Sequence, residues 1–225
     1  MSPRNEWVEP FIAQHLAYSF LSKVLYEPPS EALIRNIVQE DLFAEWPLPG
    51  SNARTDEGLK TLQQFTRDWH DERMRALERD YARLFLGPGK LLAPPWESVY
   101  RSPKGLIFER QTLEVRQFFQ RAGMPIPNLG TEPDDHIGLE LRFVAYLCAQ
   151  GLYALEINKV EAFDAILETL CQFFAAHLSQ WADQCFDQIA EHAETRFYRG
   201  IAQLASGCLA HTRAMLDAPC EALSP

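Results

Sequence analysis

The sequence has few cysteines and no paired cysteine motif. The five cysteines are odd in number and widely spaced, no C-x-x-C occurs, and they are Cys148, Cys171, Cys185, Cys208 and Cys220. Small secreted domains held together by disulfides usually carry even, closely spaced sets. Four of the five lie among apolar residues in helical segments, as buried thiols do. We therefore expect no disulfide framework and a reducing compartment.

Long apolar runs and an N-terminal leader are also absent. No stretch approaches the roughly 20 apolar residues that cross a membrane as a helix. Residues 1–7 lack the apolar centre of a secretory signal. These two absences predict a cytoplasmic protein with no stable membrane insertion.

Basic residues are outnumbered. The 225-residue chain has 21 Lys and Arg against 31 Asp and Glu, which gives a formal net charge of −10. Proteins that bind nucleic acid need clustered cations to neutralise phosphates, so nucleic acid is not expected as a partner. An acidic surface favours solubility and is compatible with a basic peptide or protein partner.

The short motifs of common catalytic and metal sites are missing. There is no H-E-x-x-H, and Gly87-Pro88-Gly89-Lys90 does not complete a phosphate-binding loop. Ser98 lacks the flanking glycines of a nucleophile elbow. His136 and Glu140 share a helix face, but two ligands do not make a metal site. The sequence predicts no catalytic residue, no metal and no cofactor.

Helical periodicity is what the chain does have. Apolar residues recur at spacings of three and four, and alternation typical of strands is never sustained. With 47% hydrophobic residues the chain can bury a large core. The predicted fold class is all-α, a compact helical domain of about eight to twelve helices. The clearest helices are expected over residues 8–24, 31–38, 59–85 with a break near 69–73, 112–122, 134–150, 159–178, 181–190 and 195–216.

The domain organisation is expected to be simple. Residues 1–225 form one helical domain, with two lobes at 1–123 and 134–225 and a hinge loop at 124–133 as an option. Hinges of this kind permit domain swapping. A monomer and a domain-swapped dimer therefore both stay open.

The most informative segment is the loop that follows the apolar helix ending at Phe85. Gly87 and Gly89 allow backbone angles closed to other residues, while the prolines fix φ and remove N–H donors. The loop is too apolar to be solvated and too interrupted to be helical. It must be packed or must pack something else, which favours binding over catalysis.

A second informative segment is Glu132-Pro133-Asp134-Asp135-His136, which we expect to open a helix. Pro133 suits the first helical position, and the carboxylates suit the positive end of the helix dipole. The dipole does not explain His136, which is either a packed core residue or, held in one tautomer by Asp135, a group that faces a ligand.

The two loops carry three motifs in order: Tyr81-x-x-Leu84-Phe85-x-Gly87-Pro88, Pro94-Pro95-Trp96-x-Ser98-Val99-Tyr100 and Glu132-Pro133-Asp134-Asp135-His136. Together these loops resemble those of the TorD/DmsD family of redox-enzyme maturation proteins, and are nearer to the DmsD branch. The resemblance implies a cytoplasmic helical chaperone, not an enzyme. It would bind the twin-arginine signal peptide and the apo form of an exported molybdenum-containing oxidoreductase. Matched by motif, with Tyr26 added from the end of the first helix, the signal-peptide residues are Tyr26, Tyr81, Leu84, Phe85, Pro95, Trp96, Tyr100, Asp135 and His136.

The family function suggests a division of labour among these residues. Aromatic and proline surfaces would bury the apolar middle of the signal. Asp135 and Glu132 would accept the arginine side chains through charge-assisted hydrogen bonds. Gly89 stands where one relative carries Trp, so the shape of the groove and the identity of the client are expected to differ.

Two alternatives stay open. The first is a small nucleotide- or metal-dependent hydrolase that uses His136, Asp135 and Glu140. The second is an assembly factor that grips a mature subunit without contacting its signal.

Overall fold

The structure is a computed structural model that describes residues 4–48, 52–70, 73–125 and 132–223. All regular secondary structure in these ranges is helical, which confirms the all-α prediction. Three short non-α segments are η1 (Asn5–Trp7), η3 (Ala82–Leu86) and η4 (Phe174–Leu178), the last two being π-helical. The α-helices are α1 (Val8–Tyr26), α2 (Glu31–Gln39), α3 (Ala53–Arg67), α4 (Met74–Tyr81), α5 (Glu97–Arg101), α6 (Arg110–Ala122), α7 (Ile137–Glu156), α8 (Val160–Phe173), α9 (Ser179–His192) and α10 (Arg196–Leu223).

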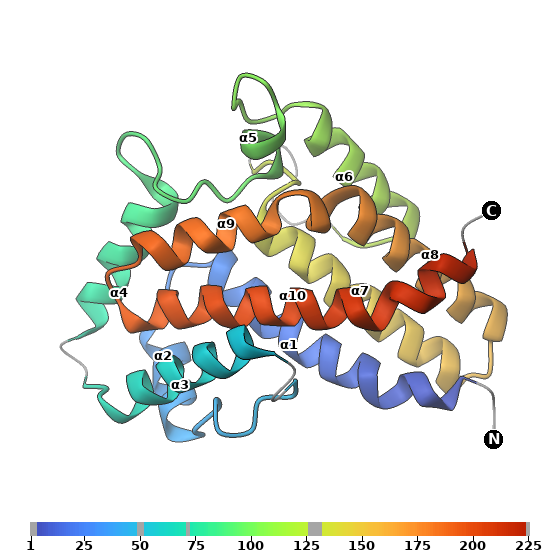
Figure 1. Ribbon diagram of the computed structural model, residues 1–225, viewed down its shortest axis with the longest axis horizontal. Coiled ribbons are helices and arrows are strands. Elements are labelled where there is room, and N and C mark those ends of the chain that lie inside the picture. Colours follow the sequence, from blue (N-terminus) through green and yellow to red (C-terminus); the bar gives the residue numbers. More distant parts are fainter. Residues whose placement is uncertain (1–3, 49–51, 71–72, 126–131, 224–225) are drawn as a thin grey trace.

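The helices are arranged around α10, which runs along most of the molecule (Figure 1). In that view α9 lies on one side of α10 and α3 on the other, and both pack against it. The longest packing interface joins α1 to α7, and α8 adds to α7. The first and last α-helices, α1 and α10, therefore pack in the same helical bundle.

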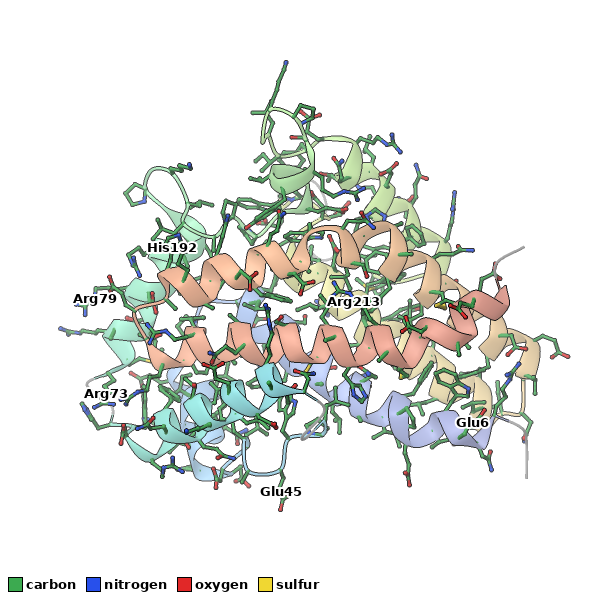
Figure 2. All side chains as sticks on the ribbon, viewed as in Figure 1. Glu6, Glu45, Arg73, Arg79, His192 and Arg213 are labelled. Carbon is green, nitrogen blue, oxygen red and sulfur yellow. A yellow bond between two sulfur atoms is a disulfide. The ribbon has the colours of Figure 1, made fainter. Side chains whose placement is uncertain are left out.

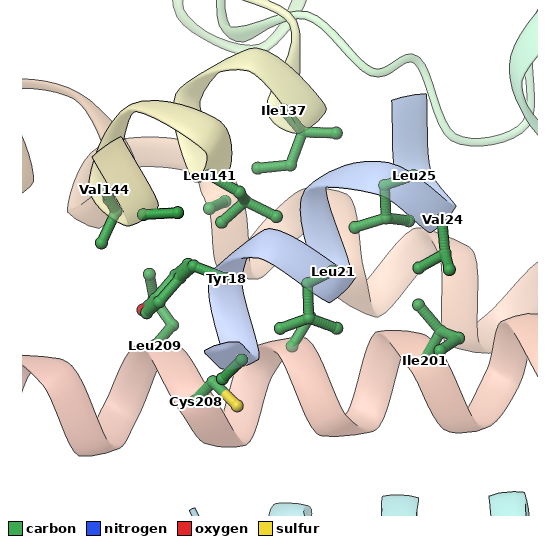
Figure 3. Close-up of a cluster of buried hydrophobic side chains, with 14 of the residues drawn as sticks. Tyr18, Leu21, Val24, Leu25, Ile137, Leu141, Val144, Ile201, Cys208 and Leu209 are labelled. Atoms are coloured by element: carbon green, nitrogen blue, oxygen red, sulfur yellow. The ribbon is translucent and has the colours of Figure 1, made fainter. Parts of the chain in front are cut away.

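One core is shared by helices from both ends of the sequence. Side chains of α1 point between α7 and α10 (Figure 3). Tyr18 and Leu21 of α1, Leu141 of α7 and Leu209 of α10 are each at most 1% exposed. The buried hydroxyl of Tyr18 is 2.8 Å from Oγ1 of Thr212, so this polar group keeps a hydrogen bond inside the core.

Several helix ends carry local signals that lie within a few residues of them. Oγ of Ser30 accepts a hydrogen bond from the backbone N–H of Leu33 at 3.3 Å, which caps α2. Helix α3 stops at Arg67 and α4 begins only at Met74, so the expected break is confirmed. Gly123 ends α6 with a φ of 72°, a left-handed conformation that glycine adopts without a steric cost.

The cysteine prediction was wrong for one pair. Cys171 and Cys220 form a disulfide with a Cα–Cα distance of 5.6 Å. The pairing was missed because α10 continues to Leu223, beyond the predicted end, and so carries Cys220 back against α8. Cys148, Cys185 and Cys208 are buried free thiols, as expected.

The predicted lobes are packed against each other. Helices α1 and α3 come from the first predicted lobe, yet they pack on α7 and α10 of the second. Most of the predicted hinge at 124–133 falls on residues 126–131, which lie outside the described residues. The hinge therefore stays a prediction.

Charged side chains lie mainly on the outside. Glu6, Glu45 and Arg73 extend from the edges of the molecule (Figure 2). Arg213 instead lies between α10 and α9, where its Nη1 is 2.7 Å from a carboxylate oxygen of Asp183. Within the described ranges, no helix combines the length and the hydrophobicity that a membrane span requires.

Candidate functional site: the loop junction

The two informative loops meet at the N-terminal end of α7. Trp96 and His136 form an isolated antiparallel bridge. The backbone N–H of Ile137 donates to the carbonyl of Pro95 at 2.7 Å, and that of Glu97 donates to the carbonyl of Asp135 at 2.9 Å. The loops are thus tied together by their backbones, and we call this region the loop junction.

His136 is the N-cap of α7 rather than a residue of its first turn. The helix begins at Ile137, and Nδ1 of His136 accepts a hydrogen bond from the N–H of Gly138 at 3.0 Å. The expectation that Pro133 is the first helical residue was therefore wrong, since Pro133 precedes the cap. Because Nδ1 accepts, the proton of the neutral ring lies on Nε2.

His136 should give the protein a measurable sensitivity to acid. Burial lowers its pKa to about 3, so the folded protein keeps the ring neutral where an unfolded chain, with a pKa of about 6.5, binds a proton. Stability that is present above pH 6.5 is therefore lost as the pH falls toward 3. Between pH 6 and 5 we expect the wild type to lose about 1 kcal/mol more than His136→Asn, which keeps a capping acceptor.

Urea unfolding of both proteins at a series of pH values measures this difference. The other titrating groups are common to both proteins and cancel in the comparison. Parallel stability curves for the two proteins would show that His136 does not stay neutral in the fold.

Two half-exposed aromatic side chains flank His136. The ring centroid of Tyr26 is 5.1 Å from that of His136, and that of Trp96 is 6.0 Å away, both edge-on. Nε1 of Trp96 donates to Oε1 of Glu132 at 2.7 Å, which fixes the indole. The hydroxyl of the buried Tyr81 donates to the carbonyl of Tyr26 at 2.9 Å. We call Tyr26, Trp96 and His136 the aromatic patch.

Negative charge lies beside the aromatic patch, on Glu132 and Glu27. Within the described part of the chain, neither Glu132 nor the exposed Glu27 forms an ion pair. Burial raises the pKa of Glu132, against the hydrogen bond from Trp96. The pKa of Tyr81 is raised mainly by burial, with further contributions from Glu132, Tyr26 and Glu27. Both carboxylates therefore lie near enough to the Tyr81 hydroxyl to disfavour negative charge on it. A cationic ligand would be favoured here.

Asp135 is placed differently from what the resemblance implies. It is fully buried, and its carboxylate accepts from the N–H of Ser98 at 2.8 Å and from the hydroxyl of Thr112 at 2.6 Å. The neighbouring Asp134, also fully buried, pairs with Arg116. Both aspartates therefore hold α5 and α6 against the start of α7 and do not face solvent.

The remaining predicted residues divide between the surface and its support. Tyr81, Leu84 and Phe85 are at most 3% exposed, and Pro95 is buried as well. Tyr100 is half-buried and its hydroxyl donates to Gln188 at 2.9 Å. Of the nine predicted residues, Tyr26, Trp96 and Tyr100 are the ones that offer substantial surface.

An apolar hollow lies next to Tyr100. It has a volume of about 350 Å³. Its apolar lining comes from Leu91, Leu92, Pro94, Val99 and Tyr100, and its polar lining from Lys90, Gln188 and His192. The predicted signal-peptide residues did not include Leu91, Leu92, Pro94 or Val99, although their place in an apolar Gly/Pro loop was a usable signal. The hollow and Trp96 are connected by the single short helix α5.

The residues of the hydrolase alternative form no recognisable reaction centre. Both carboxylate oxygens of Asp135 and Nδ1 of His136 are engaged in the fold. Glu140 is fully buried, accepts from Nε1 of Trp181 at 3.3 Å, and has its pKa raised by burial and by Glu97. Across the described ranges, no three His, Cys, Asp or Glu side chains are arranged to hold a metal ion.

Comparison with known proteins decides the family. Residues 49–187, more than half of the chain, match the profile of the nitrate reductase delta subunit family, to which the TorD and DmsD chaperones belong. The chain is a TorD/DmsD-family protein. Its similarity is greater to the DmsD branch, as the loop motifs predicted.

Individual members of the family are similar to this chain over most of their length. The Tat proofreading chaperone DmsD of Salmonella typhi is 29% identical over 197 residues, covering 86% of this chain and 85% of the relative. The chaperone protein TorD of Shewanella pealeana is 24% identical over 195 residues, covering 83% and 82%. A crystal structure of a protein described as a redox enzyme maturation protein, from Archaeoglobus fulgidus, shares the fold, with a TM-score of 0.51 and 15% identity over 85% of this chain and 91% of that one.

Proposed function

We propose that this TorD/DmsD-family protein is a cytoplasmic chaperone, without catalytic activity, for an exported molybdenum-containing oxidoreductase. It binds the twin-arginine signal peptide and the apoprotein and assists maturation before export. The observation that carries the proposal is the half-buried Trp96, held by Glu132 and His136, with the hollow lined by Pro94, Val99 and Tyr100 close by along the chain. That combination matches a ligand with a basic start and an apolar middle.

The signal peptide would use both parts of the site. Its apolar middle would enter the hollow beside Tyr100, with a gain of about 25 cal/mol for each Å² of apolar surface buried. Its arginines would lie against Glu132 and Glu27, since Asp135 is committed to the fold. Tyr26, Trp96 and Tyr100 would contact the peptide. The supporting residues would be Tyr81, Leu84, Phe85, Pro95, Asp135 and His136.

The signal peptide must be released before export, so the affinity of the protein for it must be limited. A dissociation constant near the micromolar range corresponds to about −8 kcal/mol, which allows the complex to exchange. A single aromatic anchor together with partly solvated carboxylates is compatible with this range, because exposed ion pairs contribute little each. Tight, irreversible capture is not what this site would produce.

A charge-removing change tests where the arginines bind. Glu132→Gln should weaken binding of a synthetic twin-arginine signal peptide about 5- to 10-fold, because one charge-assisted acceptor is lost. Titration of a fluorescently labelled peptide measures the effect. Glu45→Gln, at an exposed position outside the loop junction, is the control and should bind normally. A peptide in which both arginines are replaced by glutamine should bind weakly to the wild type and to both variants. For this peptide the affinities of Glu132→Gln and the wild type should differ much less than for the original peptide.

Unchanged affinity of Glu132→Gln would place the arginines elsewhere on the protein. The assembly-factor alternative is tested with the client oxidoreductase. Deletion of the client's signal should abolish the complex if the signal is the main contact. A complex that survives the deletion would instead favour recognition of the mature subunit.

A further inference from the structure

A second hollow, separate from the loop junction, is lined by cations. It has a volume of about 310 Å³ and lies where α5, α6 and η4 meet. Arg101, Arg110 and Arg121 line it, with Phe118 and His177. These three arginines gather around one cavity although the chain as a whole has a net charge of −10. We call this cavity the arginine pocket, and Figure 1 shows α5 and α6 side by side at this end of the molecule.

His177 is the innermost group of the arginine pocket. The side chain is only 2% exposed, and its Nδ1 lies 2.7 Å from Oε2 of the fully buried Glu97. The second ring nitrogen, Nε2, has no hydrogen-bond partner among the described residues. Because Glu97 occupies the Nδ1 edge, the edge that carries Nε2 is the one available to the cavity. The Glu97 carboxylate can only accept, so Nδ1–H donates to it and Nε2 of the neutral ring carries a lone pair.

The backbone at this wall is irregular. Segment η4 is π-helical, and single-turn π segments inside α-helices are frequent at functional sites. Arg101 donates from Nη1 to the carbonyl of Ala176 within η4 at 2.8 Å and also pairs with Glu97. The ring of Phe118 packs edge-on against His177 at 5.4 Å between centroids. Arg101 and His177 are therefore fixed in place before any ligand binds.

The charges that face the pocket leave a positive excess. Arg101 is paired with Glu97, and Nε of Arg110 is 2.6 Å from Oε1 of Glu114, the one carboxylate that lines the cavity. Arg121 is exposed and forms no ion pair with any described residue. The planar guanidinium offers paired N–H donors that match the oxygens of carboxylate and phosphate groups.

We propose that the arginine pocket binds a small multivalent oxyanion. Arg121 and the outer N–H groups of Arg101 and Arg110 would hold its charged oxygens, and Nε2 of His177 would accept a hydrogen bond from a hydroxyl of the ligand or from a bridging water. Phe118 would cover one side of the ligand. The inference does not depend on the proposed function, since the pocket shares none of its lining residues with the aromatic patch or the apolar hollow.

Calorimetric titration at constant ionic strength tests the proposal with two probes, inorganic pyrophosphate and citrate. Saturable binding of either probe with one site per chain is expected, and Arg121→Gln should weaken it at least fivefold. Arg75→Gln, an exposed arginine on α4, is the matched control and should bind like the wild type. Binding of pyrophosphate alone would identify a phosphate ligand, and binding of citrate alone would identify a carboxylate ligand.

A second variant tests His177, the most buried polar side chain of the pocket lining. His177→Gln should weaken binding of the same probe by a similar factor if the variant folds. Arg121 is exposed, so Arg121→Gln should fold, and its result decides the question in either case. No saturable binding of either probe at millimolar concentration would overturn the proposal. So would binding that Arg121→Gln leaves unchanged.

Discussion

Trp96→Ala is expected to weaken binding of a twin-arginine signal peptide about 30-fold, equivalent to roughly 2 kcal/mol. The indole is half-exposed, yet its Nε1–H is held by Glu132 and its edge by His136. Such an aromatic side chain, presented in one orientation, loses little conformational entropy when a ligand covers it. Truncation removes the contact surface and also frees Glu132 to move.

Peptide titration together with thermal unfolding measures this effect and separates it from misfolding. Tyr153→Ala is a suitable control, because Tyr153 is a large aromatic residue that is 59% exposed on α7 and belongs to neither the aromatic patch nor the apolar hollow. The control should bind normally. If Trp96→Ala folds and retains wild-type affinity, the loop junction does not bind the signal.

Gly138→Ala is expected to destabilise the protein by roughly 2 kcal/mol, although alanine favours helices by about 1 kcal/mol over glycine. A methyl carbon at Gly138 would lie 2.6 Å from Cβ and 3.0 Å from Cα of Tyr26. Backbone and Cβ atoms cannot move aside as a flexible side chain can, so α1 and α7 would have to separate. The steric cost therefore exceeds the gain in helix propensity.

Urea denaturation of Gly138→Ala measures the loss of stability. Gln150→Ala, at an exposed position of the same helix, should change the free energy of unfolding by less than about 0.5 kcal/mol. Because the clash falls on Tyr26, peptide affinity should also decrease in Gly138→Ala. A variant as stable as the wild type would show that α1 and α7 are farther apart than the structure places them.

Local signals predicted much of the fold. The periodicity of apolar residues, the Ser30 cap and the glycine at position 123 each act within a few residues, so they can be read directly from the sequence. The disulfide could not be predicted, because Cys171 and Cys220 are 49 residues apart and meet only through the path of α10. Packing along a whole helix, rather than any local pattern, brings them together.

The candidate site was predicted in outline but not in its division of roles. Motif resemblance identified Trp96 and His136, which the structure does bring together. It could not reveal that Asp135 is buried, because an acidic residue near a helix start reads alike whether it binds Ser98 and Thr112 or a ligand. The arginine pocket had no local signal, since its residues come from α5, α6 and η4.

The central position of α10 has a consequence for how the protein is made. This helix supplies Leu204, Cys208 and Leu209 to the core and is the packing partner of α3, which precedes it by well over 100 residues. During translation, α1 to α9 therefore expose part of their apolar surface to solvent until α10 has left the ribosome. The chain would therefore pass through a vulnerable interval during its own synthesis, and helical content alone would overestimate how fast it folds.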